Sequence, residues 1–275
     1  MKHLLFGTAG IPVSTKPRNT IEGIKCVRSL GLGTMELEFV YSVNINEKSA
    51  PAVRKTAQEN GIVLTCHGQY YVNLNSDKQK TLESAGRILK AARIAWLCGA
   101  WSVCFHAGFY MGMERNAVYE TIKAQLASIA DKLKKEKNNI WLRPELTGKA
   151  TQFGDLEELL QLSKEINNVM PCIDFSHCHA RSGRYNSYKE FSGILQSVED
   201  ALGKKGLKNL HAHVSGIAYS AKGERNHLNF KQSDIKYKEL MKALKDFGAA
   251  GVVISESPNI EGDALLMKRA YEKTK

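Results

Sequence analysis

The sequence predicts a single-domain α/β protein with the (β/α)8 TIM-barrel fold, spanning residues 1–275. Short apolar runs alternate eight times with longer amphipathic segments, and no linker or low-complexity break interrupts them. Eight parallel strand-then-helix units of about 30 to 40 residues close most naturally into a barrel, with the functional site at the carboxyl ends of the strands. A doubly wound open sheet is the alternative, but "GTAGIP" is a poor match to the glycine-rich turn that such a sheet carries after its first strand.

The expected elements follow in order along the chain. The apolar runs with strand character are 3–10, 34–40, 62–68, 102–108, 140–146, 169–177, 207–216 and 251–257. The helical segments that follow them are 19–31, 49–61, 76–98, 115–137, 155–166, 188–203, 235–247 and 262–273. The first helix shows the pattern most clearly, because an Asn19-Thr20 cap starts it and Gly31 stops it.

Composition limits the partners and the compartment. Lys and Arg (39) exceed Asp and Glu (28) by 11, which favours polyanions such as DNA, although a solvated lysine-rich surface gives the same excess. Six cysteines show no CxxC spacing, and Cys66, Cys104 and Cys172 lie inside apolar runs, where a thiol behaves as a small hydrophobe. We find neither a signal peptide nor an apolar run of about 18 residues, and so expect a cytoplasmic protein with no membrane association.

Metal-type side chains gather where the expected strands end. They are His67, His106, Glu145, Asp174, His177, His211, His213 and Glu256, with Glu224 and His227 on the loop after the seventh strand. Imidazoles mixed with carboxylates suit Zn²⁺ best and also accept Mn²⁺ or Fe²⁺, and this number of ligands indicates two or three ions. Glu145 and Glu256 are placed to bridge them. Clustered metals of this kind are the usual means of hydrolysing a phosphodiester.

These residues lie in segments that resemble endonuclease IV, the zinc-dependent apurinic/apyrimidinic (AP) endonucleases of the xylose-isomerase-like barrel superfamily. The similar segments, in order, are "HGQYYVNL", "FHAG", "PELTGKATQFGDLEEL", "CIDFSHCHA", "LHAHVSG", "GERNHL" and "SESP". The resemblance implies hydrolysis of the phosphodiester 5′ to an abasic site in double-stranded DNA, by a zinc-bound hydroxide close to the catalytic bridging Glu145.

The resemblance also implies a distribution of ligands and DNA contacts. One zinc would take His67, His106, Glu145 and Glu256. A second would take Glu145, Asp174, Glu256 and His211, and a third would take His177 with ligands from "GERNHL". The residues expected at DNA are Tyr70, Tyr71, Arg181, Arg184 and Arg225. The two tyrosines fall where the family inserts a loop into DNA, and the arginines are placed for phosphates.

Departures from the family pattern concern mainly the second and third metals. The third-metal segment usually reads Asp-x-His, whereas here Glu224 and His227 are three apart, which puts that metal in doubt. His211 and His213 point to the same side of their strand, and the spacing to Glu224 favours His211 over His213.

Two other functions compete with the nuclease. Sugar isomerases and epimerases of the same superfamily hold one divalent metal with residues in the positions of Glu145, Asp174, His211 and Glu256. A barrel that only binds damaged DNA would need no metal. The additional histidines and the positive charge favour a nuclease, which we expect to act as a monomer.

Overall fold

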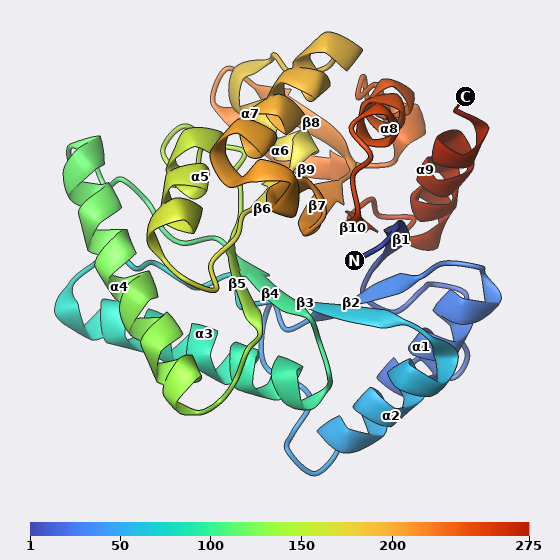
Figure 1. The fold of residues 1–275 in the computed structure, drawn as a ribbon, viewed down its shortest axis with the longest axis horizontal. Helices are drawn as coiled ribbons and strands as arrows, with labels where there is room; N and C mark the ends of the chain where they lie inside the picture. The colour runs from blue at the N-terminus through green and yellow to red at the C-terminus, as the bar shows by residue number, and fades with distance from the viewer. Residues whose placement is uncertain (275) are drawn as a thin grey trace.

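Eight parallel strands form the centre of the computed structural model, which describes residues 1–274 (Figure 1). The barrel strands are β1 (Leu4–Ala9), β2 (Thr34–Glu38), β3 (Val63–His67), β4 (Ser102–Phe105), β5 (Trp141–Pro144), β6 (Cys172–Asp174), β7 (Leu210–Val214) and β10 (Gly251–Ser255). They are hydrogen-bonded in the order β5-β4-β3-β2-β1-β10-β7-β6. Parallel bridges from Leu142 to Val169 and from Glu145 to Cys172 join the two ends of this order. The predicted TIM-barrel fold is therefore confirmed.

Helices surround the strands, as expected for alternating units (Figure 1). The eight helices that the sequence predicts are α1 (Thr20–Ser29), α2 (Ala50–Asn60), α3 (Lys78–Leu97), α4 (Arg115–Lys135), α5 (Leu156–Glu165), α7 (Tyr188–Leu207), α8 (Tyr237–Asp246) and α9 (Glu261–Lys273). Their ends have local causes. The side chain of Asn19 caps α1 by accepting from the Glu22 amide at 2.9 Å, and Gly61 ends α2 in the left-handed conformation.

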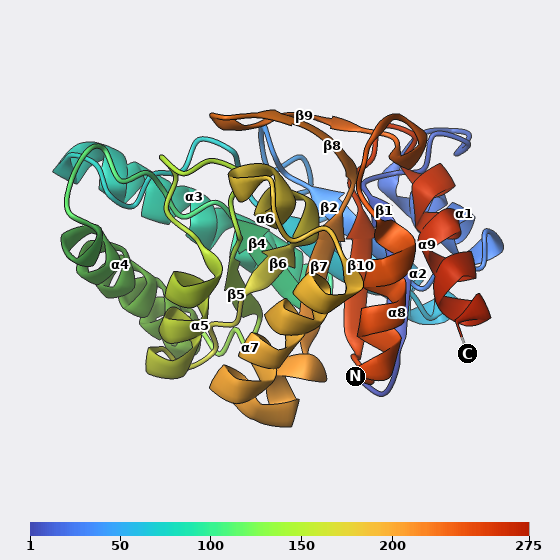
Figure 2. The same ribbon diagram turned by 90° about the horizontal axis from the view of Figure 1, so that it is seen from above.

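Four elements were not predicted from the sequence: one helix, two strands and a 3-10 turn. A short helix, α6 (Phe175–Ser182), begins directly after β6 and includes the last three residues of the expected strand 169–177, so that strand ends earlier than predicted. After β7 the chain forms a hairpin of β8 (Gly216–Ser220) and β9 (Gly223–Leu228), followed by the single 3-10 turn η1 (Phe230–Gln232). Figure 2 shows this hairpin lying across the top of the molecule, on the side where the chain leaves the barrel strands.

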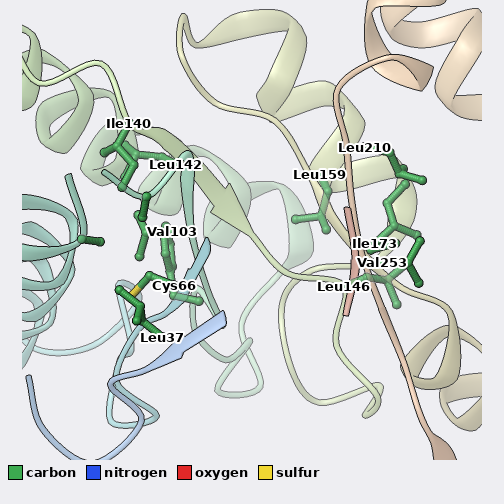
Figure 3. Close-up of a cluster of buried hydrophobic side chains, with 14 of the residues drawn as sticks. Leu37, Cys66, Val103, Ile140, Leu142, Leu146, Leu159, Ile173, Leu210 and Val253 are labelled. Carbon is green, nitrogen blue, oxygen red and sulfur yellow. The ribbon is translucent and has the colours of Figure 1, made fainter. Parts of the chain in front are cut away.

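The strands present different surfaces to the helices and to the barrel interior. Leu37, Cys66, Val103, Leu142 and Ile173 belong to the hydrophobic layer between strands and helices (Figure 3). The residues on the opposite face of the same strands are buried but mostly polar. They include Thr34, Glu36, Thr65, Ser102, Cys104, Arg143, Cys172, His211 and His213. Burying polar groups in the barrel interior costs free energy unless each group has a partner. The partners of these side chains therefore need to be identified.

Arg143 shows how the lower part of the interior is satisfied. Its guanidinium, fully buried, donates to the carbonyls of Pro171 and Asn209, each at 2.9 Å, and lies 4.5 Å from the centre of the Trp101 ring. Burial lowers the pKa of Arg143 to about 9, which leaves it charged at neutral pH.

Among residues 1–274, no helix has both the length and the apolar character needed to cross a bilayer.

Candidate metal centre

Glu145 lies at the centre of the predicted site. It follows β5, is 1% exposed, and has two imidazoles near each carboxylate oxygen. Oε2 lies 3.2 Å from His67 Nε2 and 3.4 Å from His106 Nε2. Oε1 lies 3.1 Å from His213 Nδ1 and 3.5 Å from His177 Nδ1. Burial alone would raise the pKa of Glu145, but the charges of His213 and His106 hold it well below its usual range.

A second group of ligand atoms shares Glu145. One ligand atom from each of Glu145, Asp174, His213 and Glu256 lies within 4.8 Å of the others. The strands enforce this grouping, because β7 lies between β6 and β10, and Asp174 is paired in register with His213. Glu256 Oε1 is 3.3 Å from His213 Nδ1. Glu256 thus joins this group, as the resemblance implied, but it does not join His67 and His106, where the resemblance also placed it.

Unpartnered oxygens indicate that the second group suits a cation. Asp174 Oδ2 and Glu256 Oε2 are both buried, and neither accepts a hydrogen bond. A buried carboxylate oxygen without a donor costs free energy that a bound cation offsets. These two oxygens, together with the Glu145 carboxylate and one imidazole, are a donor set that suits Zn²⁺ or Mn²⁺.

The third group is assembled from α6 and the unpredicted hairpin. His177 Nε2 lies 3.5 Å from Glu224 Oε2 and 3.4 Å from His227 Nε2. Burial would raise the pKa of Glu224, but the hydrogen bond and charge of His177 lower it to about 2. Burial and the charge of His177 both lower the pKa of His227. The three-residue spacing of Glu224 and His227 therefore still brings both side chains to His177.

The hairpin is held over the site by two glycines. Gly223 has a φ of +92°, and a Cβ there would meet the Gly148 carbonyl oxygen at 2.4 Å. The Glu224 amide donates to the same Gly148 oxygen at 2.9 Å. This close backbone contact fixes the position of Glu224 above the loop that follows β5.

His211 lies one layer deeper than the sequence analysis placed it. Its Nε2 is 3.0 Å from Glu36 Oε2, and its Nδ1 contacts the Ser102 hydroxyl at 3.0 Å. His213 instead reaches Glu145 and Glu256 through Nδ1, while its Nε2 is 2.9 Å from Glu36 Oε1. The geometry thus favours His213 over His211 as the ligand, the reverse of the order taken from spacing. His213 follows His211 by two residues on β7, and this places it one layer nearer the carboxyl ends of the strands, which form the mouth of the barrel.

Several residues of the interior escaped the sequence analysis. Glu36 and Glu38 on β2 face the barrel, and the alternation in "TMELE" is the signal that could have found them. Burial and the charge of Glu36 raise the pKa of Glu38 to about 8. Cys104 and Cys172, interpreted as small hydrophobes, in fact lie in the polar interior rather than in the hydrophobic layer that holds Cys66.

The residues expected at DNA divide into two kinds. Tyr70 and Tyr71 are 51% and 66% exposed on the loop after β3, and Tyr70 lies edge-on to His67 with ring centres 5.5 Å apart. Arg184 and Arg225 are exposed, on the turn after α6 and on β9.

Arg181, in contrast, is engaged within the protein. It donates to the carbonyls of Lys149 at 2.6 Å and Gln152 at 3.1 Å, and to the Thr147 hydroxyl at 2.8 Å. His179, which belongs to none of the three ligand groups, contacts Asp234 and donates to the Arg184 carbonyl.

Comparison with known sequences gives a family and relatives. The family model of xylose isomerase-like TIM barrels matches residues 24–273. An uncharacterised protein of Methanocaldococcus jannaschii, MJ0133, is 43% identical over 272 residues, which are 98% of this chain and 97% of that protein. A probable endonuclease 4 of Bacillus subtilis is 27% identical over 239 residues, covering 82% of this chain and 77% of that protein.

Solved structures with the same fold include both chemistries that the sequence left open. Endonuclease IV from Thermus thermophilus superimposes with a TM-score of 0.72 at 20% identity, covering 96% of this chain and 97% of that chain. A D-tagatose 3-epimerase-like protein also has a TM-score of 0.72, at 17% identity and with 97% and 96% coverage. These matches show the fold and do not choose between the two activities.

Proposed function

The chain belongs to the family of xylose isomerase-like TIM barrels, and from that premise we propose that it is a metal-dependent AP endonuclease that hydrolyses the phosphodiester 5′ to abasic sites in DNA. A relative with a named activity, the probable endonuclease 4 of Bacillus subtilis, supports this proposal. An enzyme with this activity would act in base excision repair of cellular DNA.

One observation carries the proposal more than any other. The site contains four histidines more than a single metal ion would need. Three of them, His67, His106 and His177, lie around the Glu145 carboxylate, and the fourth, His227, lies beside Glu224. An epimerase that holds one ion with Glu145, Asp174, His213 and Glu256 would have no ligand role for them. Ligand groups for two or three ions around a shared Glu145 are the arrangement used for phosphodiester hydrolysis.

The ligands would be divided among three positions. One zinc would be held by His67, His106 and Glu145. A second zinc would be held by Glu145, Asp174, His213 and Glu256. His177, Glu224 and His227 would hold a third. Bound zinc would supply the positive charge that orients a phosphate and lowers the pKa of a water molecule. Glu145, which the first two groups share, would be a ligand at both positions.

The rim would bind the DNA. The exposed rings of Tyr70 and Tyr71 are large enough to occupy the gap left by a missing base and to support a kink in the duplex. Arg184 and Arg225, which the structure leaves exposed, would meet phosphates. Arg181 would act indirectly, because its donors hold the loop of residues 147–152 in place.

The test is incision of a duplex that contains one tetrahydrofuran abasic analogue. This analogue cannot undergo β-elimination, so its cleavage requires hydrolysis. The metal-replete protein should cut 5′ to the analogue and leave a 3′-hydroxyl that a polymerase extends. Glu145→Gln should lower the rate more than about 100-fold, since even partners outside the ligand shell are worth roughly 10- to 100-fold. Glu120→Gln, an exposed carboxylate on α4, is the matched control and should cut normally.

Epimerisation of a ketose is the second candidate, because a single group of four ligands in the barrel would suffice for it. Glu145, Asp174, His213 and Glu256 would serve as its one-metal site. Metal analysis separates the candidates. The nuclease predicts zinc at two or three mouth positions, whereas an epimerase predicts one manganese or similar ion at that group and no further ion at His67 and His106.

A further inference from the structure

Below the metal centre, the barrel interior holds a second cluster with a different composition. One ligand atom from each of Cys104, Cys172, His211 and His213 lies within 4.8 Å of the others, and all four residues are fully buried. They come from β4, β6 and β7. Cys172 and His211 are paired in register on neighbouring strands, and Cys104 reaches them across the interior. No residue of the mouth except His213 belongs to this cluster.

Strand alternation explains why these thiols point inward. On β4, Ser102 and Cys104 face the interior while Val103 packs in the hydrophobic layer. On β6, Ile173 faces the helices, which directs Cys172 inward. Cys66 on β3 has the opposite orientation and lies with Val103 among hydrophobic side chains (Figure 3). Cys66 is therefore a natural control for buried thiols that have no polar neighbours.

The atoms around the cluster are polar and incompletely paired. His211 Nε2 is buried and makes no hydrogen bond, although Glu36 Oε2 lies 3.0 Å away. Cys104 Sγ lies 3.8 Å from His213 Nε2 and 3.6 Å from Glu36 Oε2. An inward thiol pair beside an unpartnered imidazole nitrogen is an expensive arrangement for a barrel core, which is normally filled with branched apolar side chains.

We propose that Cys104, Cys172, His211 and His213 form a second, sulfur-containing zinc site inside the barrel. Two thiolates with two imidazoles are a closed tetrahedral ligand set for zinc, distinct from the oxygen-rich set at the mouth. His213 links the two sites, because its Nδ1 faces Glu145 and Glu256 while its Nε2 faces Cys104. On binding, both thiol protons leave to solvent as the two sulfur–zinc bonds form, and His213 also releases its ring proton when both of its nitrogens hold an ion.

X-ray absorption at the zinc edge and metal counting test the site directly. The wild type and Cys66→Ser should both show zinc–sulfur scattering at about 2.3 Å. The double variant Cys104→Ser/Cys172→Ser should lose that scattering and bind one zinc fewer per chain. Because this readout is independent of DNA cleavage, failure of the nuclease assay would leave it unaffected.

Three results would overturn the proposal. The first is a wild-type zinc spectrum without sulfur, which is decisive even if the double variant fails to fold. The second is an equal zinc count and sulfur signal in all three proteins. The third is a titration of the denatured, unreduced proteins that finds four free thiols in both the wild type and the double variant, which would show a disulfide between Cys104 and Cys172 in the wild type.

Discussion

Arg181 and Arg184 show how differently two neighbouring arginines can serve one site. Both follow the metal ligand candidates of β6, and both were expected at phosphates. The structure gives Arg181 three backbone carbonyls and a hydroxyl to satisfy, all on residues 147–152. Arg184 uses only its backbone, which accepts from His179 Nδ1 and donates to Ser182 Oγ, and its residue is exposed. Only Arg184 has donors to spare for DNA.

We therefore expect substitution of the two arginines to have different effects, one on DNA binding and the other on stability. Arg184→Ala should weaken binding to abasic duplex and reduce the slope of log K against log salt by about 1, because one phosphate contact is lost. Arg181→Ala should lower the free energy of unfolding by roughly 2 kcal/mol, because buried carbonyls lose a charged donor. Fluorescence anisotropy across a salt series and denaturant titration measure the two effects. An unchanged salt slope for Arg184→Ala would remove it from the DNA surface.

At this scale the sequence predicts which residue types gather, and it is weaker on their depth. The strand ends correctly brought Glu145, Asp174, His177 and their histidine partners together. Sequence spacing could not rank His211 and His213 reliably, because both have the same parity, and only strand tilt and register place His213 nearer the carboxyl ends of the strands. The contacts of Arg181 with residues 147–152 were not predicted either, since nothing in a sequence shows that a loop folds back onto its guanidinium.

At the scale of elements, the β8–β9 hairpin and helix α6 complete the third ligand group. Asp174 ends β6, and its Oδ1 accepts from the His177 amide at 2.7 Å, so this carboxylate caps α6 while its other oxygen faces His177 at 3.2 Å. The hairpin supplies Glu224 and His227 from above. These elements escaped prediction because "FSHCHARS" and "GERNHL" are too polar to show an apolar period.

The glycine contact beneath the hairpin gives a prediction at this scale. Gly223→Ala should push β9 off the Gly148 carbonyl, displace Glu224 and lower zinc binding by one ion per chain, while the other ions stay bound. Gly61→Ala is the matched control, because Gly61 also has a positive φ of 62° but nothing lies within 4 Å of its added Cβ. Mass spectrometry of the metals measures both variants. Full zinc occupancy in Gly223→Ala would show that the hairpin does not position a ligand.

For the whole molecule, the polar interior links metal binding to stability. The mouth contains buried carboxylates and imidazoles whose unpartnered oxygens favour a cation in the folded state only. Binding at about 100 times the dissociation constant stabilises a fold by about 2.7 kcal/mol. Chelation of zinc should therefore lower the melting temperature by roughly 5 to 10 °C, and added zinc should restore it.

Differential scanning calorimetry with and without a chelator measures this shift. Glu145→Gln should show a smaller shift than the wild type, since it weakens two positions at once. A melting temperature that does not respond to chelation would mean that the polar groups of the interior need no metal.

The overall barrel, by contrast, was predictable from eight alternating units, because hydrophobic period and unit length depend on local sequence rather than on side-chain contacts across the core.

The central claim is that this barrel has the chemistry of a nuclease and not that of an epimerase. One comparison tests it most directly. A single metal-replete preparation is given the tetrahydrofuran-containing duplex and, separately, a panel of ketoses, and the two rates are measured at the same enzyme concentration. We predict incision of the duplex and no interconversion of any ketose. An intact duplex together with an epimerised ketose would contradict the account.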